Sequence, residues 1–176
     1  GEFQNLGAAD IPDRARRAFR PRSGRSGGKA RHPARAFDHW RHLVAESFVP
    51  LAASSKNAEN FRGRQRARRL DRVAVVEVSS TSHEVHRTPA LIAQSDQRYF
   101  KLNLQMQGTG LLIQDNREAV LQPGDLSIYD TSRPYTLAFE GDARLMVVMF
   151  PWDALSLPPD CIAELSAVRM AAGRYD

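Results

Sequence analysis

Alternation between apolar and polar residues is the clearest pattern in the second half of the chain, and it predicts strands. Over residues 100–107 every even position is apolar and every odd position is polar, which is the period of a strand. The β-branched run at 73–78 predicts a second strand. The uninterrupted apolar run at 145–150 predicts a third strand, buried on both faces and ended by Pro151.

Glycine, proline and short polar residues divide the same region into further short strands. Turns are predicted where these residues cluster, at 108–110, 115–116, 123–125, 132–134 and 140–142. Short strands are expected between the turns, at 111–113, 118–121, 126–129 and 135–139. Asp115–Asn116 suits the turn of a hairpin, and Gly124 is expected to adopt a positive φ. Strands at this close spacing are typical of an antiparallel sandwich or small barrel.

Two segments have the spacing of amphipathic helices. Apolar residues recur at helical intervals over residues 37–48, and Pro50 follows the end of this segment. Residues 52–60 are expected to be a linker. A second, short helix is predicted over residues 160–168, with four residues on its apolar side: Cys161, Ile162, Leu165 and Val168. No partner for that side follows in the chain, so we expect a frayed end or a missing continuation.

The strand at 100–107 has two faces, of which only one can point into the core. We expect its apolar residues, Leu102, Leu104 and Met106, to face the core. The polar residues then face either a polar pocket or, as the favoured alternative, the solvent. Three of them, with one tyrosine from the strand at 126–129, are the candidate ligand-binding residues: Lys101, Asn103, Gln105 and Tyr129.

Positive charge is concentrated at the start of the chain. Residues 1–36 contain nine Lys or Arg residues against three acidic ones, so they carry more than the whole formal net charge of +5. Residues 21–33 are rich in Gly and Ser and have almost no apolar side chain, which predicts a disordered basic arm. Such an arm is either a contact for nucleic-acid phosphates or, as the favoured interpretation, an idle solvated extension.

A second group of arginines lies at 62–72, just before the strand at 73–78. Arginines on one face of an early strand can contact nucleic acid. They also protect the edge of a sheet from pairing with another molecule, and a solvated edge is the favoured interpretation.

Length and composition indicate one ordinary domain. The chain has 176 residues, of which 42% are apolar and 26% are charged. It contains no apolar run of the about 18 residues that a membrane span needs, and no apolar leader at its start. The single cysteine, Cys161, allows neither an internal disulfide nor a cysteine-rich metal site. We therefore expect a cytoplasmic protein without membrane contact.

The histidines and possible nucleophiles are not arranged for chemistry. His83 and His86 are three residues apart in an extended segment, where they point to opposite faces and do not form a chelate. His39 and His42 share a helix face but have no acidic or cysteine partner. The nucleophile and phosphate-binding motifs G-x-S-x-G, G-x-x-x-x-G-K and G-x-G-x-x-G are missing. We therefore expect no enzyme activity, no bound metal and no cofactor.

Several motifs in the second half of the chain carry a family resemblance. A glycine turn follows Gln107, Leu-x-Pro-Gly-Asp spans 121–125, and Asp-x-x-Arg-Pro-Tyr spans 130–135. Val-His-Arg-Thr at 85–88 and the proline that closes the last strand also fit, although Trp152 stands where the family often has Arg. In these motifs the chain resembles the N-terminal, cupin-like effector domain of AraC-type transcriptional regulators. The residues that match are expected to have structural roles: Arg87, Gly108, Pro123, Gly124, Asp125, Asp130, Arg133, Pro134, Tyr135 and Pro151.

The resemblance implies a mainly β, cupin-like double-stranded β-helix, or jelly-roll barrel, with a flanking N-terminal helix and a short C-terminal helix. It covers residues 37–170 and leaves a basic arm at 1–36 and a truncated tail at 171–176. In such regulators the barrel senses a small-molecule effector or mediates dimerisation, and a separate C-terminal pair of helix-turn-helix units contacts DNA. This chain has no such C-terminal part. The resemblance thus implies an unidentified effector, a possible homodimer, and DNA contact only through a domain that is not present here.

Two other functions remain open at this point. One is a stand-alone cupin-like metal enzyme or small-molecule-binding protein, although the chain has no histidine between 108 and 176 to hold a metal. The other is direct nucleic-acid binding by the basic arm together with the arginines at 62–72.

Overall fold

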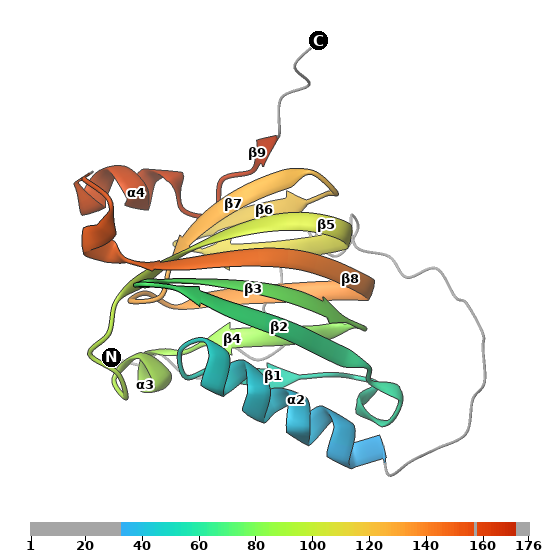
Figure 1. Ribbon diagram of the computed structural model, residues 1–176. Coiled ribbons are helices and arrows are strands. Elements are labelled where there is room, and N and C mark those ends of the chain that lie inside the picture. The colour runs from blue at the N-terminus through green and yellow to red at the C-terminus, as the bar shows by residue number, and fades with distance from the viewer. Residues whose placement is uncertain (1–32, 157, 172–176) are drawn as a thin grey trace, which may run out of the picture.

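The computed structural model describes residues 33–156 and 158–171, and this part of the chain is mainly β (Figure 1). The expected basic arm at 1–36 and the expected tail at 171–176 lie almost wholly outside these residues. Every pair of neighbouring strands is antiparallel in the described part. The predicted fold class, with a helix on either side of the strands in sequence, is confirmed.

The strands follow the predicted spacing but differ in length. They are β1 (Ala52–Ser54), β2 (Gly63–Leu70), β3 (Val73–Ser80), β4 (His83–Arg87), β5 (Tyr99–Gln114), β6 (Arg117–Leu121), β7 (Asp125–Asp130), β8 (Tyr135–Pro151) and β9 (Met170–Ala171). The α-helices are α2 (Pro33–Ser47), α3 (Pro89–Ile92) and α4 (Pro159–Leu165), and short 3-10 helices are η1 (Ala58–Asn60) and η2 (Trp152–Ala154). Helix α2 confirms the helix predicted at 37–48, but it begins at Pro33, so the end of the expected disordered arm is helical. Helix α4 confirms the one predicted at 160–168 only as far as Leu165.

Strands β5 and β8 run side by side and join the two halves of the fold. The first part of β5 pairs with β7 and with the last part of β8, whereas its second part pairs with β6 and with the first part of β8. Strand β3 adds to the last part of β8, and β4 adds to the first part. One sheet therefore folds over on itself into a small barrel, with α2 lying along one side (Figure 1).

Two predicted strand ends are bends inside longer strands. Gly108 has a φ of +75° and lies where the pairing of β5 with β8 shifts register, and the chain then continues as strand to Gln114. Gly141 has a φ of +71° within β8. A positive φ lets a strand accommodate an extra residue and change direction before pairing resumes. The chain does bend at 108–110 and 140–142, as predicted, but the prediction that strands end there was wrong.

The tight hairpin predicted at Asp115–Asn116 is confirmed. Both residues have a positive φ, of 51° and 60°, as the central residues of a two-residue hairpin turn require. The predicted linker at 52–60 was wrong in part, because it contains β1 and η1. Strand β1 has only three residues and is held by pairing with β4. Its own sequence is too short to show the periodic pattern that predicts a strand.

The inward face of β5 is the reverse of the predicted one. Lys101, Asn103 and Gln105 are buried, whereas Leu102 and Leu104 are half-buried and Met106 is 40% exposed. The favoured expectation that the polar face is an ordinary outer face was therefore wrong. A period of two defines two faces without saying which one is inside, and here the outer face is covered in part by other segments.

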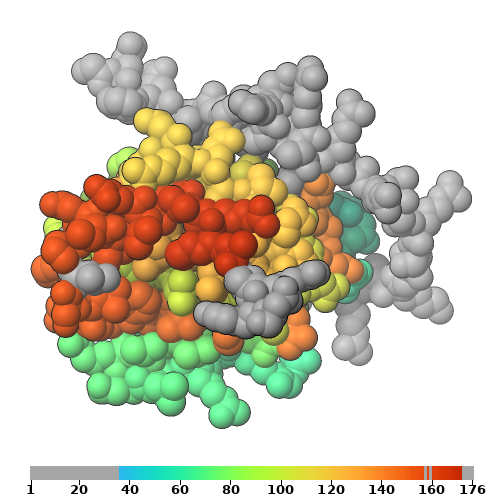
Figure 2. All heavy atoms as spheres, turned by 90° about the horizontal axis from the view of Figure 1, so that it is seen from above, coloured from blue at the N-terminus to red at the C-terminus, as the bar shows by residue number. Residues whose placement is uncertain are grey.

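Helix α4 provides that cover at one end of β5. Its Ile162 is buried against Phe100 and Ile128 on the outer face of the sheet. Figure 2 shows α4 and β9 lying across this side of the molecule, next to β6 and β7. The other three residues predicted on the apolar side of α4, namely Cys161, Leu165 and Val168, are exposed. A helix of seven residues in the structure makes too few turns to bury the whole stripe.

Two predictions about strand surroundings have different outcomes. Strand β2 pairs with β3 alone among the described strands and its arginines are exposed, so the expected solvated edge is confirmed.

The run at 145–150 was expected to be buried on both faces. Leu145, Val147 and Met149 are buried, but the residues between them are only half-buried because α4 and its neighbours cover part of the outer face.

Alanine substitutions at two glycines separate backbone strain from steric overlap. Gly124 has a φ of +93° and open space where a Cβ would stand, so Gly124→Ala is expected to lower the free energy of unfolding by about 1–2 kcal/mol through strain alone. Gly108→Ala adds strain and a Cβ only 2.4 Å from the Asp142 carbonyl oxygen. We expect Gly108→Ala to lower the free energy of unfolding, measured with urea, by clearly more than Gly124→Ala does. Equal losses would contradict the close approach of β5 to β8 at Gly108.

Candidate ligand-binding site

A cavity lies inside the barrel, closed on one side by α2 and the segment that follows it. Its volume is about 40 Å³, enough for a water molecule but less than the about 150 Å³ of an apolar cavity that accepts benzene. Most of its lining is apolar or aromatic, and the residues come from α2 and the segment that follows it and from β3, β4, β5, β7 and β8: Trp40, Val44, Phe48, Leu51, Val78, His83, Val85, Lys101, Tyr129, Tyr135, Leu137, Phe139, Leu145 and Val147.

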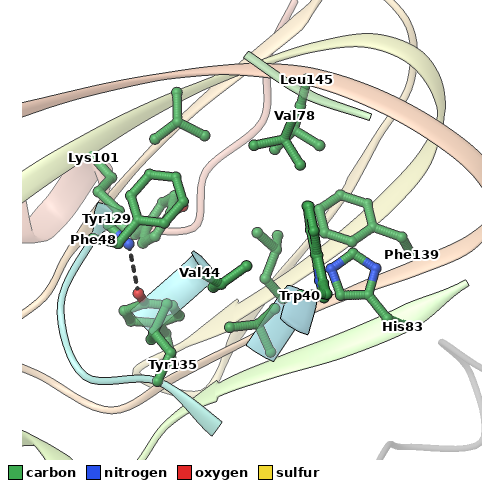
Figure 3. Close-up of a pocket in the computed structure, with 14 residues that line it drawn as sticks. Trp40, Val44, Phe48, Val78, His83, Lys101, Tyr129, Tyr135, Phe139 and Leu145 are labelled. Carbon is green, nitrogen blue, oxygen red and sulfur yellow. Dashed lines mark hydrogen bonds between the residues drawn. The ribbon is translucent and has the colours of Figure 1, made fainter. Parts of the chain in front are cut away.

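Lys101 places an amine at one end of this cavity (Figure 3). The side chain is 2% exposed, and its Nζ donates a hydrogen bond to the Tyr135 hydroxyl over 3.1 Å. The Nζ also lies 4.2 Å from the centre of the Phe48 ring and within 6 Å of the rings of Tyr129 and Tyr135. Aromatic faces stabilise a cation in such a position, but less than a carboxylate does.

No carboxylate compensates the charge of Lys101 among the described residues. Lys101 takes part in none of the ion pairs found there. Burial therefore lowers the pKa of Lys101, the positive charge of Arg87 lowers it further, and the resulting pKa is about 7. Burial also raises the pKa of both tyrosines around it well above the ordinary value of 10, so their hydroxyls stay protonated.

The other end of the cavity is formed by aromatic rings. Trp40 and His83 pack edge to face with centroids 5.6 Å apart, and His83 stacks on Phe139 at 5.1 Å (Figure 3). The indole Nε1 of Trp40 is buried and has no hydrogen-bond partner among the described residues. A buried N–H usually has an acceptor, so this donor is an exception among the buried groups of the site.

His83 is neutral at this end. Burial lowers its pKa to about 4. Its Nδ1 lies 3.0 Å from the carbonyl oxygen of Thr81, which only accepts, so Nδ1 carries the proton and Nε2 keeps a lone pair. The pair His83 and His86 does not converge, as predicted, since the ring of His86 lies on the other face of β4 and contacts Glu84.

The four candidate ligand-binding residues have different places in the structure. Lys101 and Tyr129 line the cavity and are opposite each other on neighbouring strands. Asn103 and Gln105 face the same interior but are not part of the lining. Gln105 donates to the backbone carbonyl of Gln107 at the β5 bend, which is a structural role. The amide of Asn103 is buried with neither of its polar atoms partnered in the described part of the chain.

Most residues of the family motifs hold turns and do not line the cavity. Arg87 is buried and donates to the carbonyl oxygens of Pro50, Leu91 and Thr131, so it ties three separate segments together. Pro151 closes β8 opposite Tyr99.

The Pro123–Gly124 turn is anchored by the residue that follows it. Asp125 accepts from the backbone N–H of Gln122 and pairs with Arg169 over 2.6 Å. Burial raises the pKa of Asp125, but these two hydrogen bonds outweigh it, so the pKa lies below its ordinary value. The carboxylate therefore stays charged and fastens the end of the described chain to the turn.

The turn at 130–135 is held in a similar way. Asp130 accepts from the N–H and hydroxyl of Ser132, and Arg133 pairs with both Asp130 and Asp115. Arg133 thus links this turn to the β5–β6 hairpin. Pro134, exposed, follows it and leads into β8.

Twelve of the fourteen lining residues were missed as site residues, and four of them, Tyr135, Trp40, Phe48 and His83, shape the two ends of the cavity. Tyr135 was assigned to the turn, but its hydroxyl reaches into the cavity and contacts Lys101. Trp40, Phe48 and His83 come from segments far from the motif region. A helix whose apolar side includes a tryptophan carries a signal for packing, and nothing in it distinguishes a cavity wall from a filled core.

Two general features of the described residues complete the site. They contain no group of three or more His, Cys, Asp or Glu side chains placed to hold a metal ion. No helix within them is long and apolar enough to cross a membrane.

Replacing Lys101 by Met tests the cost of burying the amine. The pKa is about 7 in the folded protein and 10.5 for an ordinary lysine, so below pH 7 the folded state carries the full desolvation penalty. Between pH 7 and 10.5 the unfolded state binds more protons, and this group makes stability rise with pH. We therefore expect Lys101→Met to exceed the wild type in free energy of unfolding by roughly 2–5 kcal/mol at pH 6, with the gain shrinking toward pH 10.

Lys56→Met is the matched control for this measurement. Lys56 is exposed, so the same change of side chain is expected to leave the pH dependence of urea unfolding as in the wild type. A gain for Lys101→Met that stays constant from pH 6 to pH 10 would contradict the lowered pKa.

The sequence of the chain matches a known domain family. The family model described as the AraC-binding-like domain matches residues 40–174. An uncharacterized protein in the nit 5′ region of Bacillus sp. (strain OxB-1) is 39% identical over 115 residues, which cover 65% of this chain and 45% of that protein. The present chain therefore spans less than half of the length of that relative.

One solved structure shares this fold over most of the chain. The AraC-like transcriptional activator CuxR superposes with a TM-score of 0.61 at 18% identity, over 73% of this chain and 46% of that one. A cupin superfamily protein from Desulfitobacterium hafniense DCB-2 is 17% identical over 51% of this chain and 78% of that one, with a TM-score of 0.43. Since the family model matches well over half of the residues, the chain belongs to the AraC-binding-like domain family.

Proposed function

We propose that this domain is the effector-sensing part of an AraC-type transcriptional regulator, and that its effector is a small organic molecule bound in the cavity under α2. The observation that carries the proposal is the cavity itself, an apolar space inside the barrel with the Lys101 amine at one end and the rings of Trp40 and His83 at the other. Apolar pockets with a few directed polar groups are typical of small-molecule sites.

The size of the cavity supports a role for α2 in sensing. A space of about 40 Å³ holds only water-sized molecules, so an organic effector requires one wall to move outward. Trp40 and Val44 belong to α2, and Phe48 follows its last residue. The helix is joined to β2 by hydrogen bonds from the Gln65 side chain to the Leu43 carbonyl and the Ser47 hydroxyl. The strands of the cavity wall are held in place by backbone hydrogen bonds to neighbouring strands. Helix α2 has no such bonds to the sheet among the described residues, so it is the wall that moves outward when an effector binds.

Several finer points belong to the same proposal. The whole regulator is proposed to contact DNA through a part of the protein outside this chain, which spans 45% of its relative in Bacillus sp. (strain OxB-1). The domain is proposed to act in the cytoplasm, to form a homodimer, and to bind its effector without chemical turnover. A response of the regulator then arises when effector binding changes the position of α2.

A single-tryptophan variant tests whether the cavity binds organic molecules. The sequence has two tryptophans, and Trp152 is 44% exposed on η2, far along the chain from the cavity wall. In Trp152→Phe the emission of Trp40 alone reports on the cavity. We expect at least one compound from a library of small organic molecules to change this emission and to raise the melting temperature of the protein.

Adjacent valines on β8 provide the control. Val147 lines the cavity and Val148 lies on the opposite face of the strand. Val147→Phe fills the cavity and is expected to abolish both signals, whereas Val148→Phe is expected to keep them. A library that gives no compound with both signals, or binding that persists in Val147→Phe, would contradict the proposed function.

A further inference from the structure

Lys101 is a group that the fold does not need. Its amine makes one hydrogen bond, to Tyr135, and all other contacts described for it are with aromatic rings. A methionine or leucine at this position would fill the same space without removing a charge from water. A buried amine without a counter-charge lowers the stability of the protein, and groups of this kind are concentrated at binding and catalytic sites.

The cavity has an excess of positive charge. Its lining contains no Asp or Glu, and His83 is neutral, so Lys101 is the one lining residue in the described chain that carries charge near pH 7. The guanidinium of Arg87, next to Lys101, is bonded only to carbonyl oxygens among the described residues. Arg87 does not line the cavity, but its positive charge acts on the Lys101 amine, and no described carboxylate forms an ion pair with either group.

Lys101 and Tyr135 each have a proton left to donate beyond the hydrogen bond between them. An ammonium has three N–H donors, of which one is used on the Tyr135 oxygen. Because the Tyr135 oxygen accepts from Lys101, its own hydroxyl proton is free to point to a third group. A carboxylate has two acceptor oxygens. One can accept a hydrogen bond from the Lys101 ammonium and the other can accept one from the Tyr135 hydroxyl.

We propose that the effector is a small monocarboxylic acid bound as its anion, with the carboxylate on the Lys101 ammonium and the Tyr135 hydroxyl and a compact apolar body toward Trp40. This inference rests on the proposed function and adds the chemical class of the effector. A neutral amide or alcohol leaves the ammonium uncompensated. A phosphate monoester brings a second negative charge, and Lys101 is the one described lining residue with a positive charge to compensate it.

Matched probes of equal shape test this assignment. Hexanoate and cyclohexanecarboxylate are compared with hexanamide and cyclohexanecarboxamide by calorimetry and by Trp40 emission in Trp152→Phe. At pH 6 we expect each carboxylate to bind at least about tenfold more tightly than its amide. Lys101→Met is expected to remove this preference and Tyr135→Phe to reduce it, whereas Lys56→Met, with an exposed lysine changed, keeps it.

The pH profile identifies the charge that is used. The ionisable groups near the Lys101 amine are Arg87 on β4, Tyr129 on β7 and Tyr135 on β8, and His83 lies at the far end. The two tyrosines and Arg87 do not titrate between pH 6 and 9, and His83 titrates near pH 4. Only Lys101, with a pKa of about 7 in the free protein, loses its proton in this window.

Carboxylate binding requires the protonated amine, so its pH dependence has a defined sign. The dissociation constant is expected to be flat from pH 6 to pH 7 and to rise by about tenfold per pH unit above it. The amides and the Lys101→Met variant are expected to show no such rise.

The outcomes separate this inference from the proposed function. Amides that bind as tightly as carboxylates at pH 6, and lose binding in Val147→Phe, would overturn the anion assignment while leaving effector sensing in place. Carboxylates that fail to bind, or bind equally to Lys101→Met, would also overturn it, and the library measurement with Trp40 then decides the proposed function by itself. Because Lys101→Met is expected to be more stable than the wild type, loss of binding in that variant cannot be attributed to unfolding.

Discussion

The pairing of β5 with β8 is the constraint on which the rest of the structure depends. The ladder begins with Tyr99 opposite Pro151 and ends with Gln114 opposite Tyr135, and it passes the bend at Gly108 with only local shifts of register. Strands β3, β4, β6 and β7 each attach to one part of these two strands. Because the backbone groups of both long strands remain paired on either side of the bend, the sheet folds over without creating two new edges.

The same ladder determines what lies inside the barrel. Lys101 stands opposite Tyr129 on β7 and Met149 on β8, and all three face the interior. The bend within β8 then brings Tyr135 to within hydrogen-bond distance of the Lys101 amine, although the two residues are 34 positions apart in the sequence. Helix α2 and Phe48 close this space from the side. A polar strand face that is costly to bury is thereby enclosed with aromatic rings.

Scaffold and site use different residues of the sequence. Arg87, Asp125, Asp130 and Arg133 fasten turns and segment ends, and none of them lines the cavity. They belong to the motifs that identify the family, because any barrel of this kind needs its turns fixed. Apart from Tyr135, the residues that give the cavity its chemistry, such as Lys101 and Trp40, lie outside those motifs. The family can therefore be recognised from the sequence motifs alone. The class of the proposed effector has to be inferred from the residues that line the cavity.

The sequence by itself determined the mainly β class, the amphipathic helix before the strands, the hairpin at Asp115–Asn116 and the family, since each depends on residues close together in the chain. Only the tertiary structure decided that β5 and β8 continue through glycines, because the partner strand that carries the pairing past Gly108 is distant in sequence. It also decided which face of β5 is inside. Alternation with a period of two is the same for both faces, and the choice depends on α4 covering Phe100 outside and α2 closing over Lys101 inside.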